Sequence, residues 1–200
     1  LAVLALERAG VDPEEVRSSG SSVLVTGAAG GVGSVAVSLL AKLGYPVTAS
    51  TGRADEQGGY LTDLGATAVI DRAELSDPGR PLQTQRWAGA IDSVGSHTLA
   101  NVLAQTRYGG TVAACGLAQG ADLPATVMPF ILRGVTLTGI NSVEAPLALR
   151  EAAWRRLGTD LDEEALAAMT RFIPLAEAIP AAEDILAGRL HGRTVVDVRA

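Results

Sequence analysis

The chain has 200 residues, 48% of them hydrophobic and 19% charged, with a formal net charge of −6. Its apolar content excludes a disordered chain, and its acidic balance argues against a nucleic-acid partner, because phosphate binding needs a basic stripe. The longest apolar stretch, residues 32–43, contains Ser34, Ser38 and Lys42, so it falls short of the roughly 20 apolar residues of a membrane span. We therefore expect a compact domain with no nucleic-acid partner and no membrane.

Cysteine and histidine are scarce. The single cysteine, Cys115, cannot form a disulfide within the chain, which favours a reducing, cytoplasmic location. A structural zinc site needs about four Cys or His ligands, and the chain offers only Cys115, His97 and His191, far apart in sequence. We therefore expect no metal site. The chain also lacks an initiator methionine and opens within a predicted helix, so we expect a piece of a longer protein.

Strands and helices are predicted to alternate over the first 145 residues. The predicted strands are short β-branched runs, and the first of them is flanked by Gly20 and Gly27, as is typical of a buried parallel strand. In chain order the strands are expected at 22–26, 46–50, 68–71, 89–92, 110–115 and 135–138, with helices at 32–43, 55–64 and 96–106. This alternation predicts an α/β fold, a doubly wound parallel sheet of the Rossmann type.

Beyond residue 145 the pattern changes. Apolar residues recur with helical spacing at 146–157, 162–171 and 178–187, and we expect a helix at each. A β-branched run at 194–198 then closes the chain and is predicted to be a strand. The Rossmann domain is therefore expected to carry a C-terminal helical extension and a closing strand.

The strongest chemical signal lies between the first strand and the first helix. The segment Val-Thr-Gly-Ala-Ala-Gly-Gly-Val-Gly-Ser, residues 25–34, contains the pattern Ala28-x-Gly30-x-x-Gly33, which is the dinucleotide-binding fingerprint with alanine at its first position. Small residues let the backbone turn sharply and approach a pyrophosphate, while the helix N-terminus supplies free N–H groups. A tight turn that binds nothing is the alternative interpretation.

Two other nucleotide-binding families share parts of this pattern. A phosphate-binding P-loop requires a lysine before its final Ser or Thr, whereas Ser34 directly follows Gly33. Short-chain dehydrogenases need a tyrosine with a lysine four residues later for proton transfer. The only lysine, Lys42, precedes all three tyrosines of the chain. Both families are therefore excluded.

The residues after the second strand favour NADP(H) over NAD(H). In NAD-binding domains an acidic residue about 20 positions beyond the glycines binds the ribose 2′-hydroxyl. Here the strand leads into Thr51, Gly52 and Arg53, with no acid before Asp55. Arg53 can bind a 2′-phosphate in bidentate fashion, and Thr51 can donate a hydrogen bond to it. An exposed loop arginine without a ligand is the alternative.

Several segments together resemble a known family, the zinc-independent medium-chain dehydrogenases/reductases. The resemblance is closest to the quinone oxidoreductase-like group that includes the acrylyl-CoA reductases, and it covers essentially the whole chain. The segments that carry it are 25–34, 51–53, Trp-Ala-Gly-Ala-Ile-Asp-Ser-Val-Gly at 87–95, Tyr-Gly-Gly-Thr-Val-Ala-Ala-Cys-Gly-Leu at 108–117, Met-Pro-Phe-Ile-Leu-Arg-Gly-Val at 128–135, and 188–196. The segment 128–135 is the most specific of them.

The resemblance implies an enzyme that uses NADPH to reduce an activated carbon–carbon double bond, for example that of a short 2-enoyl-CoA such as acryloyl-CoA. A hydride would pass to the β-carbon and a proton to the α-carbon, with no metal, so the protein mainly positions the reactants and stabilises the enolate. A quinone or another enone is an alternative substrate. A non-catalytic NADP(H)-sensing module and a reductase module of a polyketide synthase are further alternatives. The proton donor and any catalytic residue are not identified.

Positions in the family assign roles to individual residues. The pyrophosphate would meet Ala29, Gly30, Gly31, Val32 and Gly33; the 2′-phosphate Thr51, Gly52 and Arg53; and the nicotinamide half Leu117, Ile131 and Ser142. Ser93 and Gly116, at the ends of later strands, should line the same crevice. Relatives carry a second arginine where this chain has Ala68, so the resemblance implies a looser hold on the 2′-phosphate.

The resemblance also implies a barrel-like N-terminal lobe outside this chain. Residues 1–18 are then the remnant of a helix between two lobes, 19–145 the NADP-binding Rossmann domain, and 146–200 the C-terminal helices with a strand that returns to the missing lobe. Without that lobe we expect 194–198 to be disordered or mispaired, and the chain to bind cofactor but to reduce substrate poorly. Family members dimerise, and the uncharged run 135–140 favours a homodimer through the sheet edge.

Overall fold

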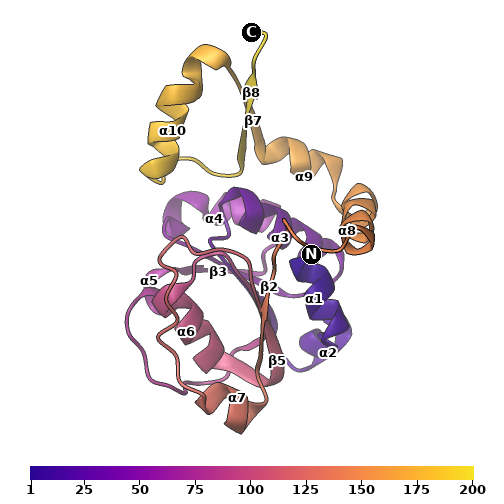
Figure 1. The fold of residues 1–200 in the computed structure, drawn as a ribbon, viewed down its shortest axis with the longest axis vertical. Helices are drawn as coiled ribbons and strands as arrows, with labels where there is room; N and C mark the ends of the chain where they lie inside the picture. Colours follow the sequence, from indigo (N-terminus) through magenta and orange to yellow (C-terminus); the bar gives the residue numbers. More distant parts are fainter.

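The computed structural model describes residues 1–200 as a six-stranded parallel sheet between two layers of helices, with a smaller two-stranded sheet near the C-terminus (Figure 1). The strands of the large sheet follow the order β3-β2-β1-β4-β5-β6. They are β1 (Ser22–Thr26), β2 (Val47–Thr51), β3 (Ala68–Asp71), β4 (Trp87–Asp92), β5 (Thr106–Ala114) and β6 (Thr136–Gly139). The prediction of a doubly wound sheet is therefore confirmed.

Helices cover both faces of this sheet because its strands are apolar on both sides. Val23 and Val25 of β1 belong to one buried cluster, and Leu24, which points the other way, belongs to a second. The helices of this part are α1 (Ala2–Arg8), α2 (Pro13–Ser18), α3 (Gly31–Lys42), α4 (Ala54–Asp63), α5 (Ala73–Ser76), α6 (Ser96–Gln105) and α7 (Met128–Arg133). None of the helices in the chain is long and apolar enough to cross a membrane.

The N-terminal segment differs from the single helix expected over 1–18. Two short helices, α1 and α2, are separated by a break in which Gly10 has φ +81°. Asp12 then caps α2, because its carboxylate accepts hydrogen bonds from the N–H groups of Glu14 at 2.9 Å and Glu15 at 3.0 Å. Pro13 occupies the first turn of the new helix, where proline is favoured.

The C-terminal quarter holds the largest departure from the predicted elements. It contains α8 (Leu147–Asp160), α9 (Glu163–Ala168), β7 (Thr170–Pro174), the 3₁₀ turn η1 (Leu175–Glu177), α10 (Ala178–Leu186) and β8 (Arg193–Asp197). The helix expected over 162–171 therefore ends early, and β7 follows it. The expectation that 194–198 is disordered is also wrong, because β8 pairs in parallel with β7, Phe172 opposite Val195.

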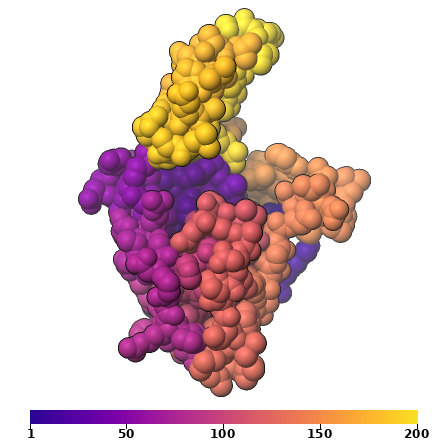
Figure 2. Space-filling view, turned by 60° about the vertical axis from the view of Figure 1, so that its left-hand side comes forward, coloured from indigo at the N-terminus to yellow at the C-terminus, as the bar shows by residue number.

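Residues 170–198, called the C-terminal module below, stand at one end of the molecule, above the glycine turn (Figures 1 and 2). Gly192 joins the two parts, since its N–H donates to the Ala29 carbonyl at 2.8 Å. Arg193 adds a hydrogen bond from Nη2 to the Gly31 carbonyl at 2.8 Å. Gly192 has φ +60°, and a β-carbon there would overlap the Met169 carbonyl oxygen. The connection therefore requires glycine at this position.

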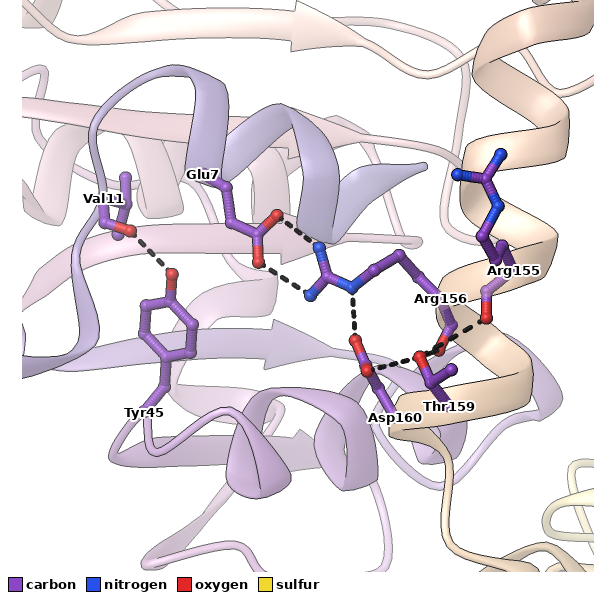
Figure 3. A network of polar contacts seen from close by, with 7 residues as sticks. All are labelled: Glu7, Val11, Tyr45, Arg155, Arg156, Thr159 and Asp160. Carbon is purple, nitrogen blue, oxygen red and sulfur yellow. Dashed lines mark hydrogen bonds and ion pairs between the residues drawn. The ribbon is translucent and has the colours of Figure 1, made fainter.

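An ion-pair network fixes α8 against the N-terminal segment (Figure 3). Arg156 donates from Nη1 and Nη2 to the two carboxylate oxygens of Glu7, each at 3.0 Å, and its Nε pairs with Asp160. These side chains are partly exposed, so the pairs contribute little to stability, at most about 1 kcal/mol. Their consequence is geometric, because the bidentate pair sets the position of α8 on the domain.

Tyr45 is buried beside this network, and its hydroxyl can be used to test the packing there. Its side chain is 4% exposed, and its hydroxyl donates to the Val11 carbonyl at 2.6 Å (Figure 3). Burial, together with the carboxylates of Glu7 and Asp12, raises the pKa of Tyr45 to about 12, while Arg156 opposes the shift. The folded state thus holds this proton more tightly than the unfolded chain, whose tyrosine pKa is about 10. The stabilisation is complete below pH 10 and is lost as the pH rises toward 12.

We expect the Tyr45→Phe variant to lose about 1 kcal/mol of stability at neutral pH, because the Val11 carbonyl loses its donor. In an ultraviolet phenolate titration, the absorbance change expected near pH 12 should be smaller in the variant than in the parent by the contribution of one tyrosine, because burial also raises the pKa of Tyr60. Tyr108→Phe is the matched control, because this side chain is 79% exposed. Its stability should stay within about 0.5 kcal/mol of the parent. A high-pH step with the full amplitude of the parent in Tyr45→Phe would contradict the assignment.

Candidate nucleotide-binding site

A crevice opens at the carboxyl ends of the strands where the sheet changes direction. β1 and β4 are neighbours, but the chain proceeds from β1 to β2 on one side and from β4 to β5 on the other. The loops that follow the two strands therefore separate and leave a space between them. The space measures about 810 Å³. Its walls come from the glycine turn after β1, the end of β2, the loops after β4 and β5, and residues 186–190 of the C-terminal module.

Six of the predicted site residues line this crevice. They are Ala29, Gly30, Thr51, Gly52, Arg53 and Ser93. The first N–H groups of α3 lack partners within the helix and lie beside Gly30, so the helix N-terminus adjoins the crevice. An anion placed there gains both free donors and the positive end of the helix dipole. The glycine turn therefore stands where the fingerprint requires.

Three other predicted glycines support the crevice from behind. A β-carbon on Gly33 would overlap the Gly27 carbonyl oxygen and lie 2.6 Å from the Ala28 Cα. A β-carbon on Gly31 would lie 3.1 Å from the Gly192 carbonyl oxygen, and one on Gly116 would lie 2.5 Å from the Ser93 carbonyl oxygen. These glycines therefore allow close packing of the backbone rather than direct exposure to a ligand.

Val32 and Ser142 line a second, apolar pocket of about 290 Å³. It lies between α1, α3 and α8 and also contains Cys115 and Ile140. Burial raises the pKa of the Cys115 thiol, and the nearby Asp92 adds to the shift. The thiol therefore stays protonated and is not poised as a nucleophile. The polar crevice and the apolar pocket meet at the first turn of α3, where Gly30 faces one and Val32 the other.

Two predicted residues lie outside both spaces. Ile131 is on α7, which precedes β6 and so lies at the amino ends of the strands, at the opposite edge of the sheet from the glycine turn (Figure 1). Arg133 confirms this placement, because it donates to the carbonyls of Ala104 and Gln83 before β4 and β5 begin. Leu117 is 65% exposed beside Gly95 and lines neither space. The structure thus separates Ile131 from the other site residues, whereas Leu117 lies in the loop after β5, next to Ala118, which lines the crevice.

The guanidinium of Arg53 already donates hydrogen bonds to other residues of the chain. Its Nη1 donates to the Arg189 carbonyl and its Nη2 to the Leu190 carbonyl, each at 2.8 Å. Gln57 links Arg53 to Thr51. Its amide nitrogen donates to Thr51 Oγ1 at 2.9 Å, and its amide oxygen accepts from Arg53 Nε at 3.1 Å. Arg53 therefore anchors the wall formed by residues 186–190, and few of its donors remain free.

Arg72 is a crevice residue that sequence reasoning missed. It follows the carboxyl end of β3, lines the crevice and packs over Gly52, where a β-carbon would lie 2.6 Å from Arg72 Nε. Its guanidinium makes no hydrogen bond or ion pair within the chain. By family position the second arginine of the relatives corresponds to Ala68, which lies at the amino end of β3, away from the crevice. The signal that identifies Arg72 is its place directly after a strand end.

A doubly wound parallel sheet, with a glycine-rich turn at its switch point and a free arginine in the crevice beside it, defines a dinucleotide-binding Rossmann domain. The chain belongs to the zinc-binding dehydrogenase family, whose family model matches residues 31–158. The predicted membership of a dehydrogenase/reductase family is therefore confirmed. No three His, Cys, Asp or Glu side chains of the 200 residues are grouped to hold a metal ion. These residues do not form a zinc site, although the family's description includes zinc.

The relatives place the chain within this family. It is 53% identical over 201 residues to the acrylyl-CoA reductase AcuI of Ruegeria pomeroyi. Among solved structures it resembles the YhdH oxidoreductase of Salmonella enterica in complex with NADP, with a TM-score of 0.93 and 52% identity. It also resembles Bacillus subtilis YhfP with NAD bound, with a TM-score of 0.89 and 47% identity. These matches cover 98–100% of the chain but only 59% of each relative's length.

Proposed function

We propose that this chain is the cofactor-binding part of an NADPH-dependent reductase that acts on an activated carbon–carbon double bond, that of a short 2-enoyl-CoA. The single observation that carries the proposal is the glycine turn at the switch point, with Arg72 free in the same crevice. The 53% identity to an acrylyl-CoA reductase supports the substrate class. The NADP-bound structure at 52% identity supports the cofactor.

The two spaces at the carboxyl edge suit the two halves of NADP(H). The pyrophosphate would lie at the N-terminus of α3, against Gly30, with the 2′-phosphate toward Arg72. The nicotinamide half would then extend past Val32 into the apolar pocket that holds Ser142. When bound, NADPH supplies the hydride that the double bond accepts. The chain's own residues bind and orient it, and the apolar pocket limits access of water to the reacting end.

A titration of the protein with NADPH and NADH, followed by calorimetry, tests this proposal. We expect NADPH to bind at least tenfold more tightly, a difference of about 1.4 kcal/mol. The preference should shrink as salt is added, because an exposed arginine–phosphate contact is screened. Equal binding of the two nucleotides would exclude a 2′-phosphate site but retain the glycine turn. No binding of either would reject the nucleotide-binding function.

A quinone is the second candidate substrate. The relative that favours it is a putative quinone oxidoreductase, YhfP of Bacillus subtilis, which is 48% identical over 198 residues. Its structure contains NAD rather than NADP, so it also bears on the cofactor preference. NADPH oxidation by the protein with acryloyl-CoA and, separately, with a quinone discriminates the two. The non-catalytic alternative predicts no oxidation with either, including in protein extended to the length of the relatives.

Further features of the whole protein follow from the surface of the chain. Phe172 and Val195 lie side by side on the two-stranded sheet and are 72% and 40% exposed, and Ile179 on α10 is 77% exposed. We propose that these exposed apolar side chains pack on a lobe formed by the remaining 41% or so of the relatives' length. The unpaired edge of β6 favours a homodimer by sheet extension, which sedimentation equilibrium tests. The free thiol of Cys115 favours a cytoplasmic location.

A further inference from the structure

Asp92 is a buried carboxylate at the base of the crevice. It is the last residue of β4, and none of its surface is exposed. One carboxylate oxygen accepts from the Thr26 hydroxyl at 2.6 Å, and the other accepts from the Gly95 N–H at 2.9 Å. No arginine, lysine or histidine pairs with it. A buried carboxylate without a cation is costly, so its presence here calls for a structural reason.

The reason lies in the number of acceptors that the site needs. Two donors point at the side chain, the Thr26 hydroxyl from the end of β1 and the Gly95 N–H from the loop after β4. A carboxylate offers two acceptor oxygens, whereas an asparagine amide offers one oxygen and one N–H₂ group. With an amide here, the oxygen could accept from the Gly95 N–H and the N–H₂ group could donate to Thr26 Oγ1, but the Thr26 hydroxyl hydrogen would then lose its acceptor. Burial raises the pKa of Asp92 above its ordinary value, and the hydrogen bonds from Thr26 and Gly95 oppose that rise.

Thr26 connects Asp92 to the loop after β4 through hydrogen bonds. Its Oγ1 accepts from the Ser93 N–H at 3.1 Å while it donates to Asp92. The Ser93 hydroxyl in turn donates to the Thr26 carbonyl at 3.0 Å. Thr26 ends β1 and Asp92 ends β4, which are the two strands paired at the switch point. This closed set of hydrogen bonds, called the Asp92 clamp below, therefore holds the two crevice walls at one separation.

The Asp92 clamp also fixes the start of the glycine turn. Gly27 follows Thr26 with φ +59°, and a β-carbon on it would lie 2.5 Å from Ser93 Oγ. Its carbonyl accepts the Gly30 N–H at 3.0 Å, and Gly33 packs directly against that carbonyl. The position of Gly27 thus determines where the N–H groups at the start of α3 point. Those groups are the ones that a pyrophosphate would meet.

We propose that Asp92 is a positioning residue for the cofactor, which acts through Thr26 and Ser93 to hold the glycine turn in its pyrophosphate-binding geometry. The inference rests on the proposed binding of NADP(H). Asp92 itself does not line the crevice, so it affects the ligand only through the clamp. Its removal should weaken contacts to the pyrophosphate and leave contacts to the adenosine 2′-phosphate end unchanged.

The test compares NADPH with 2′-AMP, which keeps the 2′-phosphate and lacks the pyrophosphate. Asp92→Asn removes one acceptor, Thr26→Val removes the hydroxyl at nearly constant volume, and Thr26→Ser retains the hydroxyl. We expect Asp92→Asn and Thr26→Val to weaken NADPH binding at least tenfold and 2′-AMP binding less than twofold. Thr26→Ser should bind NADPH within about threefold of the parent. Circular dichroism establishes that each variant is folded, and the Thr26 pair decides the question if Asp92→Asn does not fold.

The outcomes separate this inference from the proposed function. If the parent protein fails to bind NADPH, the proposed function is rejected and the inference falls with it. If the parent binds NADPH and the two clamp variants bind it within twofold, Asp92 is not a positioning residue. Equal weakening of NADPH and 2′-AMP would show a general contribution to the fold and would also overturn the inference. Selective loss of NADPH with rescue by Thr26→Ser supports it.

Discussion

Replacing Gly33 by alanine is expected to weaken NADPH binding by at least 100-fold and to destabilise the fold by about 1–3 kcal/mol. The added methyl group would overlap the Gly27 carbonyl oxygen and lie 2.6 Å from the Ala28 Cα. Both neighbours are backbone atoms of the turn, so neither can rotate away as a side chain would. The first turn of α3 must therefore shift, at the cost typical of overpacking. That shift displaces the N–H groups that would meet the pyrophosphate.

Gly58→Ala is the matched control. Gly58 lies within α4, and a β-carbon there would meet nothing within 4 Å, so the change should stabilise the fold by about 0.4–1 kcal/mol. Gly30→Ala provides an intermediate case, since its β-carbon would lie 3.3 Å from the Gly27 carbonyl oxygen. Urea unfolding and calorimetry with NADPH measure both effects. NADPH binding by Gly33→Ala at the parent's affinity would show that the pyrophosphate does not lie on this turn.

The part of the fold around Gly33 could be predicted from the sequence. The strand at 22–26, the glycine turn and the helix after it are each determined by residues adjacent in the chain. β-branched residues favour the strand, glycines allow the turn, and helical spacing follows at once. The resulting β1–turn–α3 unit agrees with its prediction to within one residue at each helix end.

The pairing of β7 with β8 could not be predicted in this way. Phe172 and Ile173 form a strand only because β8 lies beside them, and the two strands are separated in sequence by α10. Local spacing alone continued the preceding helix to 171. Arg72 and Ile131 differ from this case, because the strands beside them were expected at 68–71 and 135–138, and the strand end that each residue adjoins decides its distance from the crevice. Family position placed Ile131 with the nicotinamide half, whereas the sheet topology places it at the opposite edge.

Arg72→Ala and Arg53→Ala are expected to separate binding of the 2′-phosphate, which the sequence assigned to Arg53, from anchoring of the crevice wall. Arg72 has free donors, so its loss should reduce NADPH affinity by about 1–2 kcal/mol, roughly 5- to 30-fold, and leave NADH affinity unchanged. Arg53 instead holds the Arg189 and Leu190 carbonyls at 2.8 Å. Its loss should loosen the wall formed by residues 186–190 and weaken the binding of both nucleotides. The NADPH-to-NADH affinity ratio should change less than in Arg72→Ala.

Arg80→Ala removes the same charge from a loop outside the crevice, so it controls for the change in net charge. Calorimetry with both nucleotides gives the affinity ratio for each variant, and hydrogen exchange of the amides near residue 190 reports the wall. A larger fall in the NADPH-to-NADH affinity ratio in Arg53→Ala than in Arg72→Ala would show that Arg53, rather than Arg72, binds the 2′-phosphate. Arg53 would then have to release the two carbonyls when the cofactor binds. In that case cofactor binding and docking of the C-terminal module would compete for one guanidinium, and NADPH should increase amide exchange in residues 188–193.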